Sequence, residues 1–216
     1  MESDLIIIFF TVALAHFLAL LSPGPDFVLV VKSAIKNDRS KAIGVAAGIS
    51  TANALYIALC LIGVGAILAS SVSLMIALKI IGGLFLMFLA FQALRAKRSS
   101  YAELSIERDE QKSGETSFLK EFVTGFMSGI LNPKNLLFYL SLFTVVLTND
   151  VSQTFKIGLG IWMTTVVFFW DTAIIFLLST NKVRSKFTKL AYYIDKLTGA
   201  ILGMVGFSIV KSAFAK

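Results

Sequence analysis

The chain has 216 residues, of which 56% are hydrophobic and 15% are charged. Soluble domains average about 45–50% apolar and about 25% charged residues, so this composition excludes an ordinary water-soluble domain. The content of 19 Phe, 3 Pro and 1 Cys excludes disordered, collagen-like and disulfide-stapled chains. The net charge of +7 does not indicate a nucleic-acid partner, because the basic residues lie between apolar segments. The remaining class is a small polytopic membrane protein.

Six apolar segments follow one another along the chain, each near or above the roughly 20 residues that a membrane-spanning helix needs. Their apolar residues are continuous rather than alternating, which argues against the strands of a membrane barrel. We therefore expect an all-α integral membrane protein with six transmembrane helices in one domain, residues 1–216. The segments are about 5–31, 42–69, 74–94, 122–147, 155–179 and 197–214.

Basic residues are concentrated in every second connection between these segments. Fifteen of the 20 Lys and Arg residues lie in the first, third and fifth connections, and none lies in the second or fourth. By the positive-inside rule, the three basic connections face the cytoplasm and both termini lie outside. The longest connection, about 95–117, is predicted to be a solvated cytoplasmic linker between two halves, about 1–94 and 118–216. Binding of a regulator is the alternative role for this linker.

The two halves resemble each other in sequence at two places. The segments that begin at Lys79 and Lys196 share Lys, Gly, a small residue and Met at a constant offset of 117 residues. Ser22-Pro23-Gly24 in the first half corresponds to Asn132-Pro133-Lys134 in the second. Because each half has three spans, homologous halves must be inserted in opposite directions. The sequence therefore predicts two inverted three-helix repeats.

All three prolines, Pro23, Pro25 and Pro133, lie in the second pair of corresponding segments. A proline inside a helix removes a backbone donor and clashes with the preceding turn, so we expect the first and fourth helices to be broken. In lipid, broken backbone is tolerated only where protein or a water-filled cavity satisfies it, and paired interruptions point to a binding site. A simple packing kink is the alternative for each break.

Three motifs together resemble those of a known family. They are Leu-Leu-Ser-Pro-Gly-Pro-Asp (20–26), Gly44 and Gly48 in the second helix, and Leu-Asn-Pro-Lys-Asn (131–135) after the linker. These motifs are similar to those of the lysine exporter, or LysE/RhtB, translocators, and the resemblance extends over essentially the whole chain. It implies an exporter of an amino acid or a related small metabolite across the bacterial inner membrane.

Polar residues inside the predicted spans are the candidate site residues, because an ionisable group at the bilayer centre costs about 2.5–3.5 kcal/mol. Lys134 and the starts of the broken half-helices fit a substrate carboxylate, while Asp26 or Asp171 fits its ammonium. A fixed ion pair between Lys134 and an aspartate is the structural alternative. The predicted substrate-binding set is Ser22, Pro23, Gly24, Pro25, Asp26, Asn53, Asn132, Pro133, Lys134 and Asp171.

Export driven by the proton gradient needs a group that takes up and releases a proton inside the membrane. Asp171, Asp26 and His16 are the candidates, His16 because the ordinary pKa of histidine lies near neutrality. A hydrogen-bonded packing role is the alternative for His16. Ser50 and Thr51, next to Asn53, either line the cavity or bond back to their own helix.

Other function classes fit the sequence less well. The chain has no G-x-x-x-x-G-K-[ST] loop for ATP, and an enzyme would need clustered His, Asp or Glu. A metal-ion transporter or channel, the alternative function, would need more intramembrane carboxylates than Asp26 and Asp171. We expect no catalytic residue, metal site or cofactor, and substrate, protons and lipid as partners. Glycine pairs such as Gly44-x-x-x-Gly48 pack helices within one chain or form a homodimer.

Overall fold

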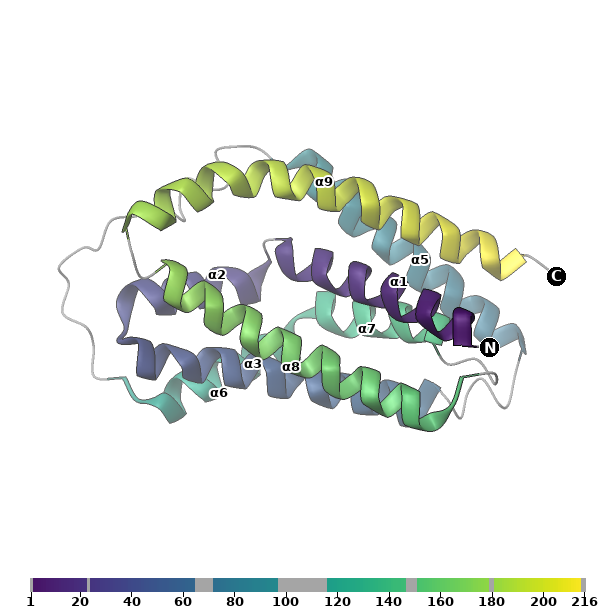
Figure 1. Ribbon diagram of the computed structural model, residues 1–216, viewed down its shortest axis with the longest axis horizontal. Coiled ribbons are helices and arrows are strands. Elements are labelled where there is room, and N and C mark those ends of the chain that lie inside the picture. Colours follow the sequence, from purple (N-terminus) through teal and green to yellow (C-terminus); the bar gives the residue numbers. More distant parts are fainter. Residues whose placement is uncertain are drawn as a thin grey trace.

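The computed structural model describes residues 2–22, 24–64, 72–96, 116–146, 151–178 and 181–214, and every regular element in these ranges is helical (Figure 1). The prediction of an all-α protein is therefore confirmed. Pro23 and most of the linker, residues 97–115, lie outside the described residues. The elements are α1 (Glu2–Leu21), α2 (Pro25–Lys36), α3 (Arg39–Leu59), the π-helical turn η1 (Cys60–Val64), α5 (Val72–Arg95), α6 (Phe118–Leu131), α7 (Pro133–Val146), α8 (Gln153–Leu178) and α9 (Asn181–Phe214).

Four described helical segments are long and apolar enough to cross a membrane: Arg39–Gly63, Ile76–Arg95, Gln153–Leu178 and Tyr192–Phe214. A fifth span results if Leu5–Leu21 and Pro25–Lys36, which meet at 55°, are joined. Helices α6 and α7 contain 14 residues each, fewer than the roughly 20 that a span needs. The predicted sixth span therefore requires α6 and α7 to be counted together, and it stays a prediction.

Both interruptions have the same local cause. Gly24 (φ −137°, ψ −175°) precedes Pro25, and Asn132 (φ −80°, ψ 105°) precedes Pro133. A residue before proline avoids the helical region, and a proline fits the first turn of a helix because that position needs no backbone donor. Each proline therefore begins a helix, and Pro133 also ends α6 at Leu131.

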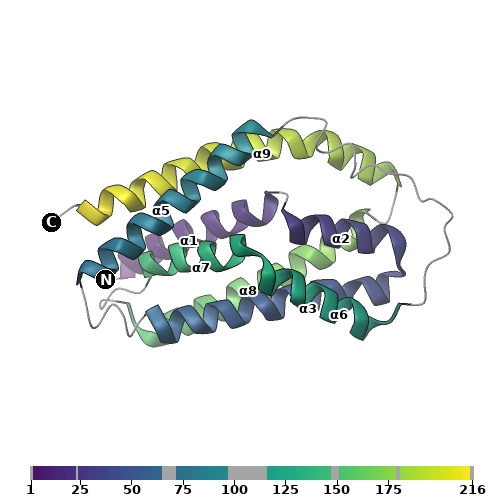
Figure 2. The same cartoon turned by 180° about the vertical axis from the view of Figure 1, so that it is seen from behind.

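The broken pairs lie against each other. Helix α1 contacts α7 and α2 contacts α6, and the path α1–α2 runs opposite to the path α6–α7 (Figures 1 and 2). The start of α1 and the end of α9 lie at one end of the molecule, whereas the end of α2 and the starts of α6 and α9 lie at the other (Figure 1). This arrangement fits the predicted orientation, in which both termini share one side of the membrane.

Glycines allow α3 and α6 to pack with their backbones in contact. A Cβ atom at Gly48 would overlap the carbonyl oxygen of Phe122, and one at Gly125 would overlap that of Val45. Only a residue without a side chain permits this approach. These small-residue patterns therefore pack helices within one chain.

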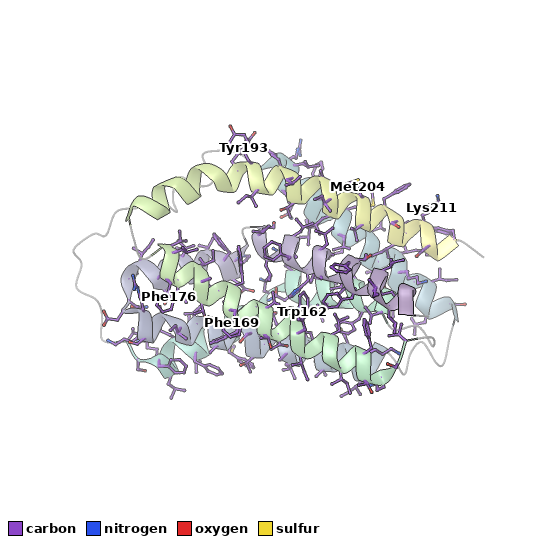
Figure 3. All side chains as sticks on the ribbon, in the orientation of Figure 1. Trp162, Phe169, Phe176, Tyr193, Met204 and Lys211 are labelled. Carbon is purple, nitrogen blue, oxygen red and sulfur yellow. The ribbon has the colours of Figure 1, made fainter. Side chains whose placement is uncertain are left out.

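The outer surface is apolar. Phe169, Phe176 and Met204 are 64%, 45% and 64% exposed and point away from the bundle (Figure 3). The buried interior, in contrast, contains polar side chains such as Asn53 and Asp171. Apolar residues outside and polar residues inside are the distribution expected of a protein whose solvent is lipid.

The fifth predicted connection is helical. This segment contains five basic residues, and α9 begins at Asn181 and continues through it without interruption to Phe214. No Gly or Pro occurs between Asn181 and Thr198, so nothing in the local sequence ends the helix. The basic segment is a helical extension of the last span.

Candidate functional site

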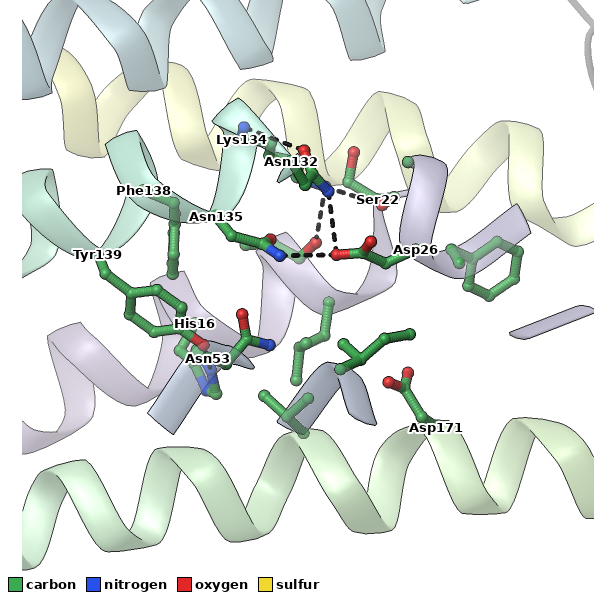
Figure 4. Close-up of a pocket in the computed structure, with 16 residues that line it drawn as sticks. His16, Ser22, Asp26, Asn53, Asn132, Lys134, Asn135, Phe138, Tyr139 and Asp171 are labelled. Atoms are coloured by element: carbon green, nitrogen blue, oxygen red, sulfur yellow. Dashed lines mark hydrogen bonds between the residues drawn. The ribbon is translucent and has the colours of Figure 1, made fainter. Parts of the chain in front are cut away.

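A cavity lies between the two helix breaks, and α1, α2, α3, α7 and α8 contribute to its wall (Figure 4). Its volume is about 50 Å³, which is room for a few water molecules. Pro25 and Pro133 begin the helices that flank it, and the predicted residue Pro23 lies outside the described residues. The other predicted site residues all line the cavity: His16, Ser22, Gly24, Asp26, Asn53, Asn132, Lys134 and Asp171.

The carboxylate of Asp26, in the first turn of α2, joins the two breaks. Its Oδ1 accepts a hydrogen bond from Ser128 Oγ at 2.6 Å. Its Oδ2 accepts one from Asn132 Nδ2 at 2.9 Å and one from Asn135 Nδ2 at 2.7 Å (Figure 4). All three donors are neutral, so they stabilise a negative charge on Asp26 without neutralising it. The start of α2 is thereby held against the α6–α7 break.

Side chains from across the cavity also satisfy the carbonyl groups that the breaks release. The last carbonyls of any helix lack intrahelical partners. At the end of α1, Lys134 Nζ donates to the carbonyl oxygens of Ala19 and Ser22 at 3.2 and 3.1 Å. At the end of α6, Tyr56 donates through its hydroxyl to Ile130 O, and Asn135 Nδ2 donates to Gly129 O. The exposed backbone of each break is thus stabilised by polar side chains.

The opposite wall of the cavity has a different chemistry. Asp171 on α8 is 6% exposed and, within the described part of the chain, has no hydrogen-bond or ion-pair partner. Asn53 Oδ1 and His16 Nδ1 are also buried without a hydrogen-bond partner among the described residues. His16 Nε2 lies 3.4 Å from the Tyr139 hydroxyl. The cavity therefore contains buried polar groups whose hydrogen-bonding capacity is not used.

Sequence reasoning missed three side chains that build the site. Ser128, Asn135 and Tyr139 contribute to it. Asn135 lies inside the Leu-Asn-Pro-Lys-Asn motif, so its proximity to the predicted break was a signal that could have identified it. Ser50 and Thr51 bond back to Ala47 O of their own helix, which is the second of the two roles considered for them.

A metal site finds no support in the described residues. Among these residues, no three His, Cys, Asp or Glu side chains gather in a group that could hold a metal ion. The polar groups of the cavity are mainly amides, hydroxyls and single charges, a set that suits an organic molecule with several hydrogen-bonding groups.

The chain is similar to known bacterial transport proteins. It is 30% identical to a threonine efflux protein of Salmonella typhi over 210 residues, which cover 96% of this chain and all of that relative. It is 28% identical to the threonine efflux protein of Escherichia coli strain K12, again over 96% of this chain and all of the relative. It is also 28% identical to the uncharacterized membrane protein YrhP of Bacillus subtilis over 87% of this chain and 90% of that protein. No solved structure matches the chain significantly. The family model of the LysE type translocators matches residues 17–212, and the chain therefore belongs to that family.

Proposed function

We propose that the protein is a secondary exporter that moves an amino acid or a closely related small metabolite across the bacterial inner membrane. The observation that carries this proposal is the cavity between two helix breaks, where buried polar side chains and half-helix ends meet. Paired interruptions of this kind line substrate sites in secondary transporters. The threonine efflux proteins that align with 96% of the chain support amino acids as the substrate class.

The proposed architecture is two inverted three-helix repeats, about residues 1–94 and 118–216, whose first helices are the broken pairs. The packing of α5 against α9 supports this arrangement. Gly83 lies against Gly206, and Ala90 lies against Gly199, so the two helices are antiparallel. With the offset of 117 residues between the repeats, Leu86 in α5 corresponds to Gly203 in α9. Each of these two residues lies between the two contacts along its own helix. A twofold axis within the membrane plane requires such corresponding residues to lie at the centre of the contact between the two helices.

We place proton coupling at Asp171 in this proposal, so that inward movement of a proton drives outward movement of substrate. A buried carboxylate without hydrogen-bond donors is stabilised either by a proton or by a cation, and Asp171 lines the cavity in such surroundings. Competition between a proton and a substrate ammonium for this one group would make export an antiport. His16, in the same cavity, is the second candidate for carrying a proton.

Efflux from proteoliposomes tests the proposal. Purified protein is reconstituted with a panel of radiolabelled amino acids inside the vesicles, and efflux is measured with and without an imposed proton gradient. We expect efflux of at least one amino acid, accelerated by the gradient. The matched pair of variants is Gly24→Leu, whose added Cβ would lie 3.4 Å from Lys134 Nζ at the cavity wall, and Thr165→Ala on the exposed face of α8.

The outcomes separate the parts of the proposal. Gly24→Leu is expected to abolish efflux, because its side chain occupies the space where substrate and broken backbone meet, while Thr165→Ala is expected to transport at the wild-type rate. Absence of wild-type efflux for every amino acid would contradict amino-acid export. Efflux that does not respond to the proton gradient would contradict only the coupling.

A further inference from the structure

The two carboxylates in the cavity differ in what surrounds them. Asp26 already accepts hydrogen bonds from Ser128, Asn132 and Asn135. These bonds use both of its oxygens and connect α2, α6 and α7. A substrate ammonium that bound Asp26 would have to displace donors that also hold the two breaks together. The hydrogen bonds of Asp26 therefore fit a residue that positions the helix breaks.

Asp171 has the opposite surroundings. It projects into the cavity from α8, apart from Asp26, whereas Asn53 and His16 lie beside Tyr139 (Figure 4). Among the described residues, Asn53 Oδ1 and His16 Nδ1 are buried without a hydrogen-bond partner, and the Asp171 side chain, which is 6% exposed, makes no hydrogen bond with them. Buried polar groups normally have partners, so these groups, which line one cavity, mark a place where a ligand can supply the partners.

The chemistry of these side chains favours a cation that has several N–H donors. A carboxylate and an amide oxygen are acceptors, and an ammonium group offers three N–H donors together with the charge that a buried carboxylate lacks. Water would satisfy the amide oxygen but would leave the carboxylate uncompensated. Lys134 and the starts of α2 and α7 lie at the helix breaks, where a substrate carboxylate fits better.

We infer that Asp171, assisted by the amide oxygen of Asn53 in the same cavity, binds the ammonium group of the substrate, and that Asp26 positions the helix breaks without contacting substrate. This inference rests on the proposed function as an amino-acid exporter. It assigns different roles to two aspartates that the sequence alone treats as equivalent.

Ligand-induced thermal stabilisation of purified protein tests the assignment, because it measures binding without requiring transport. Each amino acid of the panel is compared with its α-hydroxy acid, for example L-alanine with L-lactate, in which a hydroxyl replaces the ammonium. Wild-type protein is expected to bind the amino acid at least about tenfold more tightly, because charge-assisted hydrogen bonds are the stronger ones. Asp171→Asn is expected to remove this preference, and Asn53→Ala is expected to weaken amino-acid binding.

Asp26→Asn is the matched control, because it makes the same chemical change on the other side of the cavity. It is expected to lower the melting temperature and to keep the preference for the amino acid over the α-hydroxy acid. A preference that persists in Asp171→Asn, or one that disappears in Asp26→Asn, would overturn the inference. The Asp26→Asn result decides the question even if Asp171→Asn does not fold. Stabilisation of the wild type by no amino acid at all would instead contradict the proposed function.

Discussion

Asn135 Nδ2 donates a hydrogen bond of 2.7 Å to Asp26 Oδ2 and so joins the first turn of α7 to the first turn of α2, 109 residues apart in the chain. The same amide nitrogen donates to Gly129 O near the end of α6. One side chain therefore connects three helix ends. This connection explains how two breaks, each unfavourable in lipid by itself, are stabilised as a pair.

Removal of this side chain is the first prediction. Asn135→Leu removes one of the two donors to Asp26 Oδ2 and the donor to Gly129 O, and loss of a hydrogen bond to a charged group costs about 1.5–3 kcal/mol. We expect a clear decrease in the melting temperature of the purified protein, followed by circular dichroism in detergent. The control, Thr165→Ala, removes a hydroxyl that bonds only within its own helix on an exposed face, and we expect a change within about 0.5 kcal/mol. Equal stability of Asn135→Leu and wild type would contradict a stabilising role.

Two glycine-to-alanine substitutions are expected to have opposite effects. A Cβ atom at Gly48 would overlap Phe122 O, so Gly48→Ala must push α3 away from α6 and costs about 1–3 kcal/mol. A Cβ atom at Gly158 on α8 would have no neighbour within 4 Å among the described residues, so Gly158→Ala should stabilise its helix by up to about 1 kcal/mol. Thermal unfolding of the two variants measures the difference. Equal melting temperatures would show that the close approach of α3 and α6 is not required.

A polar contact at the opposite end of α2 provides a third prediction. Ser33 Oγ donates to Glu121 Oε2 at 2.6 Å, and Thr116 Oγ1 donates to Glu121 Oε1 at 2.8 Å. Ser33 is buried, so the pair is partly shielded from solvent. In a double-mutant cycle with Ser33→Ala and Glu121→Ala, we expect a coupling energy of about 0.5–3 kcal/mol. Strict additivity of the two variants would show that this contact does not hold α2 against α6.

The local causes of the fold were visible in the sequence, whereas the long-range contacts were not. Pro25 and Pro133 predicted both helix breaks because proline acts on its immediate neighbours. The roles of Ser128 and Tyr139 depend on residues about a hundred positions away, and no local pattern encodes such contacts. The basic residues after Asn181 predicted a connection between spans but not that it is helical, because charge marks the membrane boundary and does not end a helix.

Orientation in the membrane can be tested with single cysteines. Of the Lys and Arg residues, 15 lie in the first, third and fifth connections, which predicts that these connections are cytoplasmic. In a variant without Cys60, Ser99→Cys should be inaccessible to an impermeant thiol reagent in intact cells, and Ser71→Cys should be labelled. Lysed cells serve as the control, in which both positions should react. Labelling of both positions in intact cells would contradict the predicted topology.

The last prediction separates two roles for Asp171. If it formed a fixed ion pair with Lys134, Asp171→Asn would leave a buried charge uncompensated and cost about 3–5 kcal/mol. Lys134 Nζ, however, already donates to the carbonyl oxygens of Ala19 and Ser22, so we expect Asp171→Asn to change stability by less than about 1 kcal/mol.

The functional effect of Asp171→Asn should be large, because the amide keeps the size of the side chain but cannot carry a proton. We expect proteoliposomes with this variant to lose proton-driven efflux and to retain counterflow of substrate at raised concentration, since counterflow needs no net proton movement. Asp171→Glu, which keeps the carboxylate, should retain part of the driven efflux. The ion-pair role predicts instead that the double variant Asp171→Asn, Lys134→Gln recovers both stability and transport. Undiminished driven efflux by Asp171→Asn would remove this residue from the coupling mechanism and leave His16 as the group to test.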